Sequence, residues 1–78
     1  MKWTGGRLRQ VREEKGYTLC DLAAAADITP TTLSYYERGV REPGCRVFYR
    51  IAETLGERDI RWLAGVSENR EGDRKSVV

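Results

Sequence analysis

Residues 29–39 read Thr-Pro-Thr-Thr-Leu-Ser-Tyr-Tyr-Glu-Arg-Gly, and this stretch predicts one complete helix with its start and its stop. Thr29 can cap the first turn through its hydroxyl, and Pro30 suits the first helical position. Gly39 suits the left-handed residue that ends a helix. The stretch therefore predicts a short helix over residues 30–38.

The predicted helix has two unlike faces. At about 100° per residue, Leu33 and Tyr36 share the side that can join a core. The opposite side and its flanks carry hydroxyls and a cation: Thr31, Tyr35, Arg38, Thr32 and Ser34. Such a surface suits contact with DNA base edges and phosphates, and a merely solvated helix face fits it equally well.

The length and composition of the chain predict one small, all-α domain. A chain of 78 residues barely supports a single core. Apolar residues recur every three or four positions, β-branched alternation is rare, and only two prolines occur. Four further helices are expected, over residues 4–15, 19–26, 45–55 and 58–64.

Capping and turn residues also predict where the helices begin, which residues form loops, and where the folded domain ends. Thr18 followed by Asp21 resembles a capping box before the helix 19–26. Trp3 is large enough to fold back over one end of the core, and Pro43 lies in a loop over residues 40–44. Residues 1–65 are expected to form the folded domain, and the polar residues 66–78 a mobile tail.

The net charge of +2 is too small to indicate a nucleic-acid partner by itself, but it is unevenly placed. Residues 1–16 carry +3 and residues 30–46 carry +1, whereas residues 17–29 carry −2. A basic first helix beside a basic loop after Gly39 could form one positive rim.

The chain lacks the residues of a metal or cofactor site. It has no histidine, and its two cysteines, Cys20 and Cys45, form no CxxC motif. We expect free thiols in a cytoplasmic protein, one of them buried; a disulfide requires the fold to bring them together. No apolar run approaches membrane-spanning length, and no nucleophile stands at a recognisable distance from a base, so an enzyme is not expected.

Two opposite charges fall on the inner sides of their helices. Arg12 shares a side with Leu8, and Glu37 lies beside Leu33. An inward charge needs a partner, so we predict an ion pair between Arg12 and Glu37. Alternatively, each long side chain could reach water separately.

Five motifs in this order resemble the phage repressor and Cro-like (XRE-type) helix-turn-helix family: RLRQVREEKGYT, DLAAAADIT, TLSYYERG, the Arg-Glu-Pro loop, and RIAETLG followed by WLAG. The resemblance implies a compact five-helix bundle whose second and third helices form the helix-turn-helix. It also implies that Arg12 and Glu37 correspond to a buried structural pair.

The resemblance implies double-stranded DNA as the partner, with the third helix in the major groove. Positions facing base edges would be Pro30, Thr31, Ser34 and Tyr35. Positions meeting phosphate would be Arg9, Thr18, Thr29, Thr32, Arg38 and Arg41. Two departures from the family pattern reduce the number of side chains that can bond to DNA. Leu19 stands where relatives often have a phosphate-bonding glutamine, and Pro30 stands where they often have a polar base-reading residue.

The function expected from these features is that of a transcriptional regulator, most simply a repressor, acting as a homodimer. Candidates for the dimer surface are Trp62, Val66 and Val47, although packing within the monomer would explain each equally well. The alternative is an antitoxin-like or accessory helix-turn-helix protein that acts through protein contacts of its C-terminal region.

Overall fold

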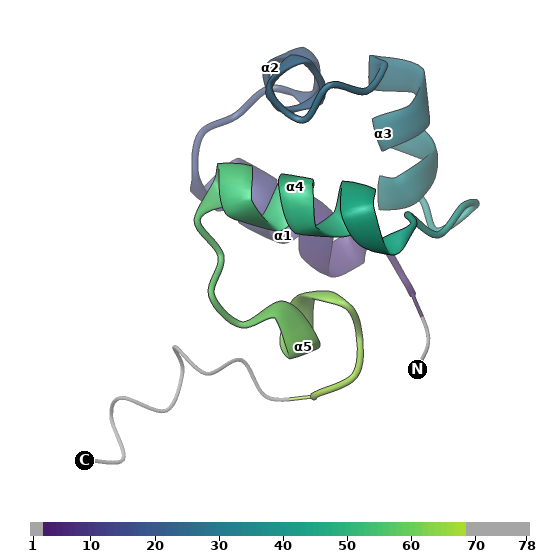
Figure 1. Cartoon of the computed structure of the whole chain (residues 1–78), viewed down its shortest axis with the longest axis vertical. Helices are drawn as coiled ribbons and strands as arrows, with labels where there is room; N and C mark the ends of the chain where they lie inside the picture. The colour runs from purple at the N-terminus through teal and green to yellow at the C-terminus, as the bar shows by residue number, and fades with distance from the viewer. Residues whose placement is uncertain (1–2, 69–78) are drawn as a thin grey trace.

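The computed structural model describes residues 3–68, and within that range it contains five helices and no strand. The helices are α1 (Gly6–Glu14), α2 (Leu19–Ala25), α3 (Pro30–Glu37), α4 (Cys45–Leu55) and α5 (Ile60–Leu63) (Figure 1). This confirms the predicted all-α fold. Each helix except α4 is one or two residues shorter than expected at one or both ends. α5 begins late because the Asp59 carboxylate caps it by accepting from the Trp62 amide.

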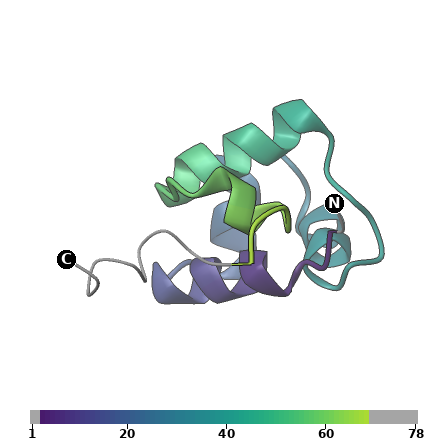
Figure 2. The same cartoon turned by 90° about the horizontal axis from the view of Figure 1, so that it is seen from below.

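The helices enclose one apolar core. Figure 2 shows α1 and α4 along opposite sides of the molecule. The six largest fully buried side chains come from all five helices: Leu8, Val11, Leu22, Leu33, Ile51 and Leu63. Apolar positions on each helix face inward as the periodicity predicted, since burial of this surface is the main force that holds a small domain together.

Helical spacing puts Cys45 in line with the buried residues Phe48 and Ile51, but the Cys45 side chain does not join the core. Cys45 is the first residue of α4 and is exposed, as is Cys20 near the start of α2. The expectation that one thiol is buried therefore fails, and both cysteines are free. Helical spacing alone cannot show that the first turn of α4 extends beyond the core.

The two helices of the helix-turn-helix begin with the caps that the sequence predicts. The Thr18 hydroxyl accepts a hydrogen bond from the Asp21 amide at 3.0 Å, and the Thr29 hydroxyl accepts one from the Thr32 amide at 3.1 Å. Pro30 occupies the first turn of α3. These bonds satisfy amides that have no partner within the helix.

The start of α1 lies directly against the end of α3. Gly5 has a φ of +84°, and a Cβ there would overlap the carbonyl oxygens of Tyr36 and Glu37. The Trp3 indole closes the same corner, because its Nε1 donates to the Tyr36 carbonyl at 2.8 Å. Its ring meets Phe48 edge to face at 6.0 Å, which confirms that Trp3 folds back over the core.

The chain immediately after α5 packs against α1. Arg7 Nη1 donates to the carbonyl oxygens of Trp62 and Ser67, both at 2.7 Å, and its guanidinium lies 5.1 Å from the Trp62 ring centroid. Val66 and Ser67, which the sequence assigned to the tail, are thus held by hydrogen bonds. The rest of the predicted tail, residues 69–78, lies outside the described residues.

Candidate nucleic-acid interface

The outer face of α3 is the surface that the sequence singled out. Leu33 and Tyr36 are buried, at 0% and 9% exposure, as the helical wheel predicts. Pro30 and Thr31 are exposed, and Ser34 and Tyr35 are partly exposed. This exposed face therefore presents hydroxyls, an aromatic ring and no carboxylate.

The turn between α2 and α3 is fixed by backbone geometry. Asp27 adopts a left-handed φ of 61°, which an aspartate tolerates better than most residues. The Ile28 amide donates to the Ala23 carbonyl at 2.9 Å, and the Ile28 side chain packs partly against the core. In Figure 1, α2 is seen end-on while α3 runs from top to bottom in the plane of the picture, the crossed arrangement of a helix-turn-helix.

Arg50 of α4 also contacts this turn, and the sequence did not predict that contact. Arg50 Nη1 donates to the Ala26 carbonyl at 3.2 Å and lies 3.8 Å from an Asp27 carboxylate oxygen. The guanidinium thus binds a carbonyl at the C-terminal end of α2, where cations are favoured. Arg50 is 24 residues away in sequence, and no local pattern marks it.

Tyr35 organises the cations at the end of α3. The guanidinium carbon of Arg38 lies 5.3 Å from the Tyr35 ring centroid, and that of Arg41 lies 5.7 Å from it. The Tyr35 carbonyl also accepts from the amides of Val40 and Arg41, at 3.0 and 3.3 Å. One residue of the predicted base-reading set therefore holds both predicted phosphate-contacting arginines in position.

The predicted ion pair between α1 and α3 is present. Arg12 Nε lies 2.6 Å from Glu37 Oε2, and Arg12 Nη2 donates to Glu37 Oε1 at 3.2 Å. The third donor, Nη1, reaches the Tyr17 carbonyl at 2.9 Å. The two side chains are only 12% and 7% exposed, so the alternative of two separately solvated groups is wrong.

The other residues predicted to contact phosphate do not form one cluster, and their side chains make different kinds of contact within the protein. The Thr29 hydroxyl donates to the Thr32 hydroxyl at 2.8 Å, which joins these two predicted positions at the start of α3. Thr18 caps α2 and is exposed. Arg9 forms an ion pair with Glu13 on its own helix, at 3.2 Å. Leu19 packs partly buried against the core, so its side chain serves packing.

No group of three or more His, Cys, Asp or Glu side chains within residues 3–68 is arranged to hold a metal ion. None of the five helices there has the length and apolar character needed to cross a membrane.

Comparison with known proteins agrees with this geometry. A protein-family model described as helix-turn-helix matches residues 8–63, which is most of the chain. The chain is 30% identical over 73 residues to an uncharacterised HTH-type transcriptional regulator, y4dJ, of Sinorhizobium fredii, covering 94% of this chain and 95% of that protein.

Other relatives share only part of their length with this chain. An uncharacterised HTH-type transcriptional regulator of Mycobacterium tuberculosis, Rv0023, is 38% identical over 52 residues, which cover 67% of this chain and 20% of the relative. The crystal structure of the clp gene regulator ClgR from Corynebacterium glutamicum superimposes with a TM-score of 0.73 at 33% identity, covering 82% of this chain and 86% of that one. The chain belongs to the Cro/C1-type (XRE) helix-turn-helix family.

Proposed function

We propose that this protein is a sequence-specific DNA-binding transcriptional regulator that inserts α3 into the major groove. The observation that carries the proposal is the exposed face of α3, where Thr31, Ser34 and Tyr35 stand beside Pro30. An α-helix fits the major groove, and hydroxyls can bond either donors or acceptors on base edges. The Pro30 ring and the Thr31 methyl add apolar contact with thymine.

The phosphate contacts follow from the stacked arginines. Arg38 and Arg41 are already gathered at the Tyr35 ring in the free protein, so less conformational entropy is lost when they meet the DNA backbone. The hydroxyls of Thr18, Thr29 and Thr32 and the side chain of Arg9 complete the proposed set. Because Leu19 carries no polar group, backbone amides at the start of α2 contact phosphate in place of a side chain.

The proposed regulator acts as a homodimer. One module of this size makes few base contacts, and a second copy doubles them on an inverted repeat. Half-sites about 34–36 Å apart place both recognition helices on the same side of the DNA. Occupation of such a site within a promoter blocks transcription, so repression is the simplest outcome. The names of the mycobacterial and rhizobial relatives support a role in regulation.

A selection of binding sites from random duplex DNA, followed by fluorescence anisotropy across a salt series, tests the proposal. We expect an inverted repeat to be enriched and the logarithm of the association constant to fall with the logarithm of salt concentration, by about 0.9 for each phosphate contacted. The double variant Arg38→Gln/Arg41→Gln should bind more weakly with a shallower slope.

The control is Lys15→Gln, which removes one positive charge at the far end of α1 and should leave the slope nearly unchanged. A flat salt response without binding at micromolar concentrations would refute the DNA-binding proposal. That result would favour the accessory function, in which the protein acts through contacts with another protein.

A further inference from the structure

The N-terminal segment crosses the C-terminal end of α3 at two glycines. A Cβ at Gly5 would overlap the carbonyl oxygen of Tyr36, and a Cβ at Gly39 would lie 2.7 Å from the carbonyl oxygen of Thr4. Both glycines have a positive φ, of 84° and 76°. Each segment thus places a glycine against a carbonyl of the other, so the two backbones approach more closely than side chains would allow.

Trp3 closes this crossing with a hydrogen bond. Its indole Nε1 donates to the Tyr36 carbonyl at 2.8 Å. The Gly39 amide donates to the same oxygen at 3.2 Å, so the indole supplies a second bond to it. The last carbonyls of a helix have no partners within the helix. The indole bond therefore ties the last turn of α3 to the N-terminal segment.

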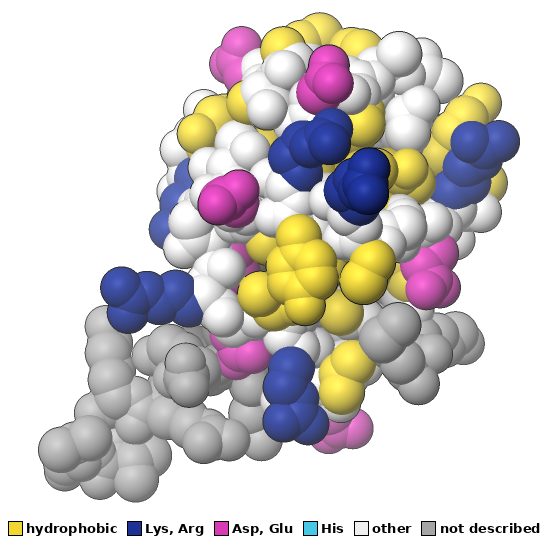
Figure 3. All heavy atoms as spheres, in the orientation of Figure 1, with side chains coloured by type: hydrophobic (Ala, Val, Ile, Leu, Met, Phe, Trp, Pro, Cys, Tyr) yellow, Lys and Arg dark blue, Asp and Glu magenta, His cyan; other side chains and the backbone are white. Residues whose placement is uncertain are grey.

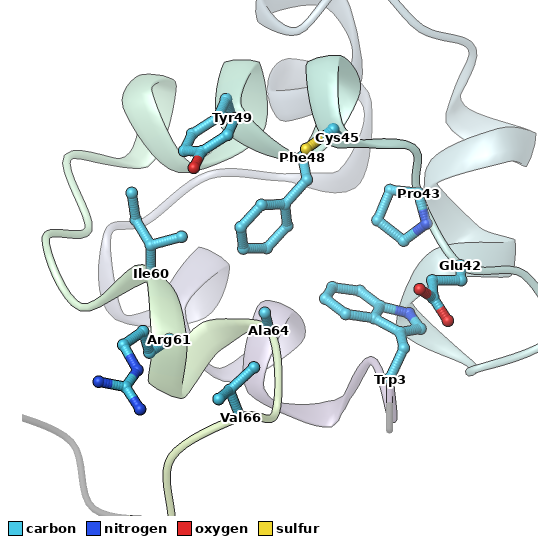
Figure 4. A pocket seen from close by; sticks show the side chains of 10 residues that line it. All are labelled: Trp3, Glu42, Pro43, Cys45, Phe48, Tyr49, Ile60, Arg61, Ala64 and Val66. Carbon is cyan, nitrogen blue, oxygen red and sulfur yellow. The ribbon is translucent and has the colours of Figure 1, made fainter. Parts of the chain in front are cut away.

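The Trp3 ring also borders the loop that follows α3, residues 40–44. The ring forms one wall of an apolar groove of about 320 Å³ that opens beside α4, on the face shown in Figure 3. In Figure 4 it lies beside Pro43 and Glu42 of that loop, while Arg61 of α5 lies on the opposite rim. Pro43 is the one buried residue of the loop. Trp3 thus stands next to the point where the loop meets the core.

The end of α3 and this loop carry the two arginines that the proposed function assigns to phosphate. Arg38 and Arg41 stack on the Tyr35 ring, and the Arg41 amide donates to the Tyr35 carbonyl at 3.3 Å. Tyr35 directly precedes Tyr36, whose carbonyl Trp3 holds. A change in the direction of the last turn of α3 would therefore move both guanidinium groups together.

The ion pair between Arg12 and Glu37 cannot fix this direction by itself. It ties the last turn of α3 to α1 at one place, and a single tie leaves the helix end free to pivot about it. Only two residues of α3 are buried, Leu33 and Tyr36, so apolar packing adds little along its length. The Trp3 bond supplies a second tie, and two ties define a direction.

We propose that Trp3 is a positioning residue for DNA binding. Its N–H holds the last turn of α3 in the orientation that brings Arg38 and Arg41 to the DNA backbone. Without that bond the folded protein samples other orientations, and its apparent affinity falls in proportion to the fraction that remains competent. This inference rests on the proposed function, because it concerns how the same arginines reach phosphate.

Replacement of the indole N–H by sulfur tests this one bond. Benzothienylalanine at position 3 keeps the two fused rings of tryptophan and lacks the donor. Cys20 permits ligation of a synthetic peptide of residues 1–19 to residues 20–78, which gives the full chain. One neutral hydrogen bond corresponds to a factor of about three to ten. We expect the affinity for a selected duplex to fall by that factor in fluorescence anisotropy.

Two measurements separate positioning from stability. Anisotropy is measured where circular dichroism shows the variant to be fully folded, so a loss of stability alone leaves the affinity unchanged. Amide hydrogen exchange without DNA should become about three- to tenfold faster at Val40 and Arg41, whose amides bond to the Tyr35 carbonyl.

The matched control is Leu55→Val, which deletes one buried methylene at the end of α4 away from α3 (Figure 1) and costs a similar amount of stability. It should change neither the affinity nor the exchange at these two amides. Trp3→Phe is a second variant without the donor, and it should lower the affinity at least as much as benzothienylalanine.

The inference is wrong if the folded benzothienylalanine variant binds the duplex as tightly as wild type. It is also wrong if Leu55→Val loses as much affinity as that variant. In both cases binding by the wild-type chain leaves the proposed function intact. Absence of DNA binding by the wild-type chain would instead refute the proposed function, and the role of Trp3 in DNA binding would fall with it.

Discussion

The ion pair between Arg12 and Glu37 provides the sharpest test of what holds the proposed DNA-binding face of α3 in place. It joins α1 to the end of α3 through two hydrogen bonds, at 2.6 and 3.2 Å. We predict that Glu37→Gln, which keeps the shape of the side chain and removes its charge, strongly destabilises the fold. The variant leaves the Arg12 guanidinium, 12% exposed, without its counter-ion.

The expected magnitude follows from that geometry. Removal of one partner from a buried ion pair costs about 3–5 kcal/mol. The glutamine oxygen can still accept from Arg12 Nε, and the Tyr17 carbonyl still accepts from Nη1, so we expect the lower end, about 3 kcal/mol. For a domain of this size that corresponds to a melting temperature lower by about 12–24 °C.

Urea denaturation followed by circular dichroism measures the free energy of unfolding. The matched control is Glu13→Gln, which removes the same charge from the exposed pair with Arg9 and should cost about 0.5 kcal/mol or less. The double variant Arg12→Met/Glu37→Leu should recover most of the lost stability, because no charge is left unpaired in the interior. If Glu37→Gln is as stable as the Glu13→Gln control, the pair has no structural role.

Four further predictions concern DNA recognition and backbone packing. Thr31→Ala should relax the preference at one or two base positions by about 1–3 kcal/mol in a binding-site selection, with little change in affinity for random DNA. Arg41→Ala should weaken binding to all sequences alike and reduce the salt slope by about 1; an unchanged slope in anisotropy would show that it meets no phosphate. Tyr35→Ala should combine both effects, since its ring holds that arginine, and a purely sequence-dependent loss would contradict this. In urea denaturation, Gly5→Ala should destabilise the protein by about 3 kcal/mol or more, and Gly16→Ala by only about 1–2 kcal/mol. Both glycines have a positive φ, but a Cβ would meet the α3 backbone only at position 5. Equal losses of stability would refute the close contact between Gly5 and α3.

Much of the helix-turn-helix could be predicted because its signals are local. The Thr29 cap, Pro30 in the first turn and Gly39 after the last turn lie within eleven consecutive residues, and each works through hydrogen bonds or dihedral angles of its own neighbours. The pairing of Arg12 with Glu37 spans 25 residues. It could still be predicted, because each charge fell on the inner side of its helix and only one obvious partner remained.

Other parts of the site could not be predicted, because they depend on how separate helices are placed. Arg50 reaches the end of α2 from α4, and no spacing in the sequence links the two. Cys45 occupies a core position on a helical wheel, yet the first turn of its helix extends past the core into solvent. Likewise, the sequence predicts a base-reading role for Tyr35, but only the folded loop shows that both arginines also lie against its ring.

The sequence by itself determined the five helices, their inward faces and the polar surface of α3, because periodicity and capping act within a few residues. Tertiary structure decided which surfaces remain open and which charges meet. The groove beside α4 brings Trp3, Phe48 and Ile60 together from three separate segments of the chain. Its opposite rims carry Glu42 and Arg61, and their placement exists only once the core has fixed α4 and α5 relative to the N-terminal segment.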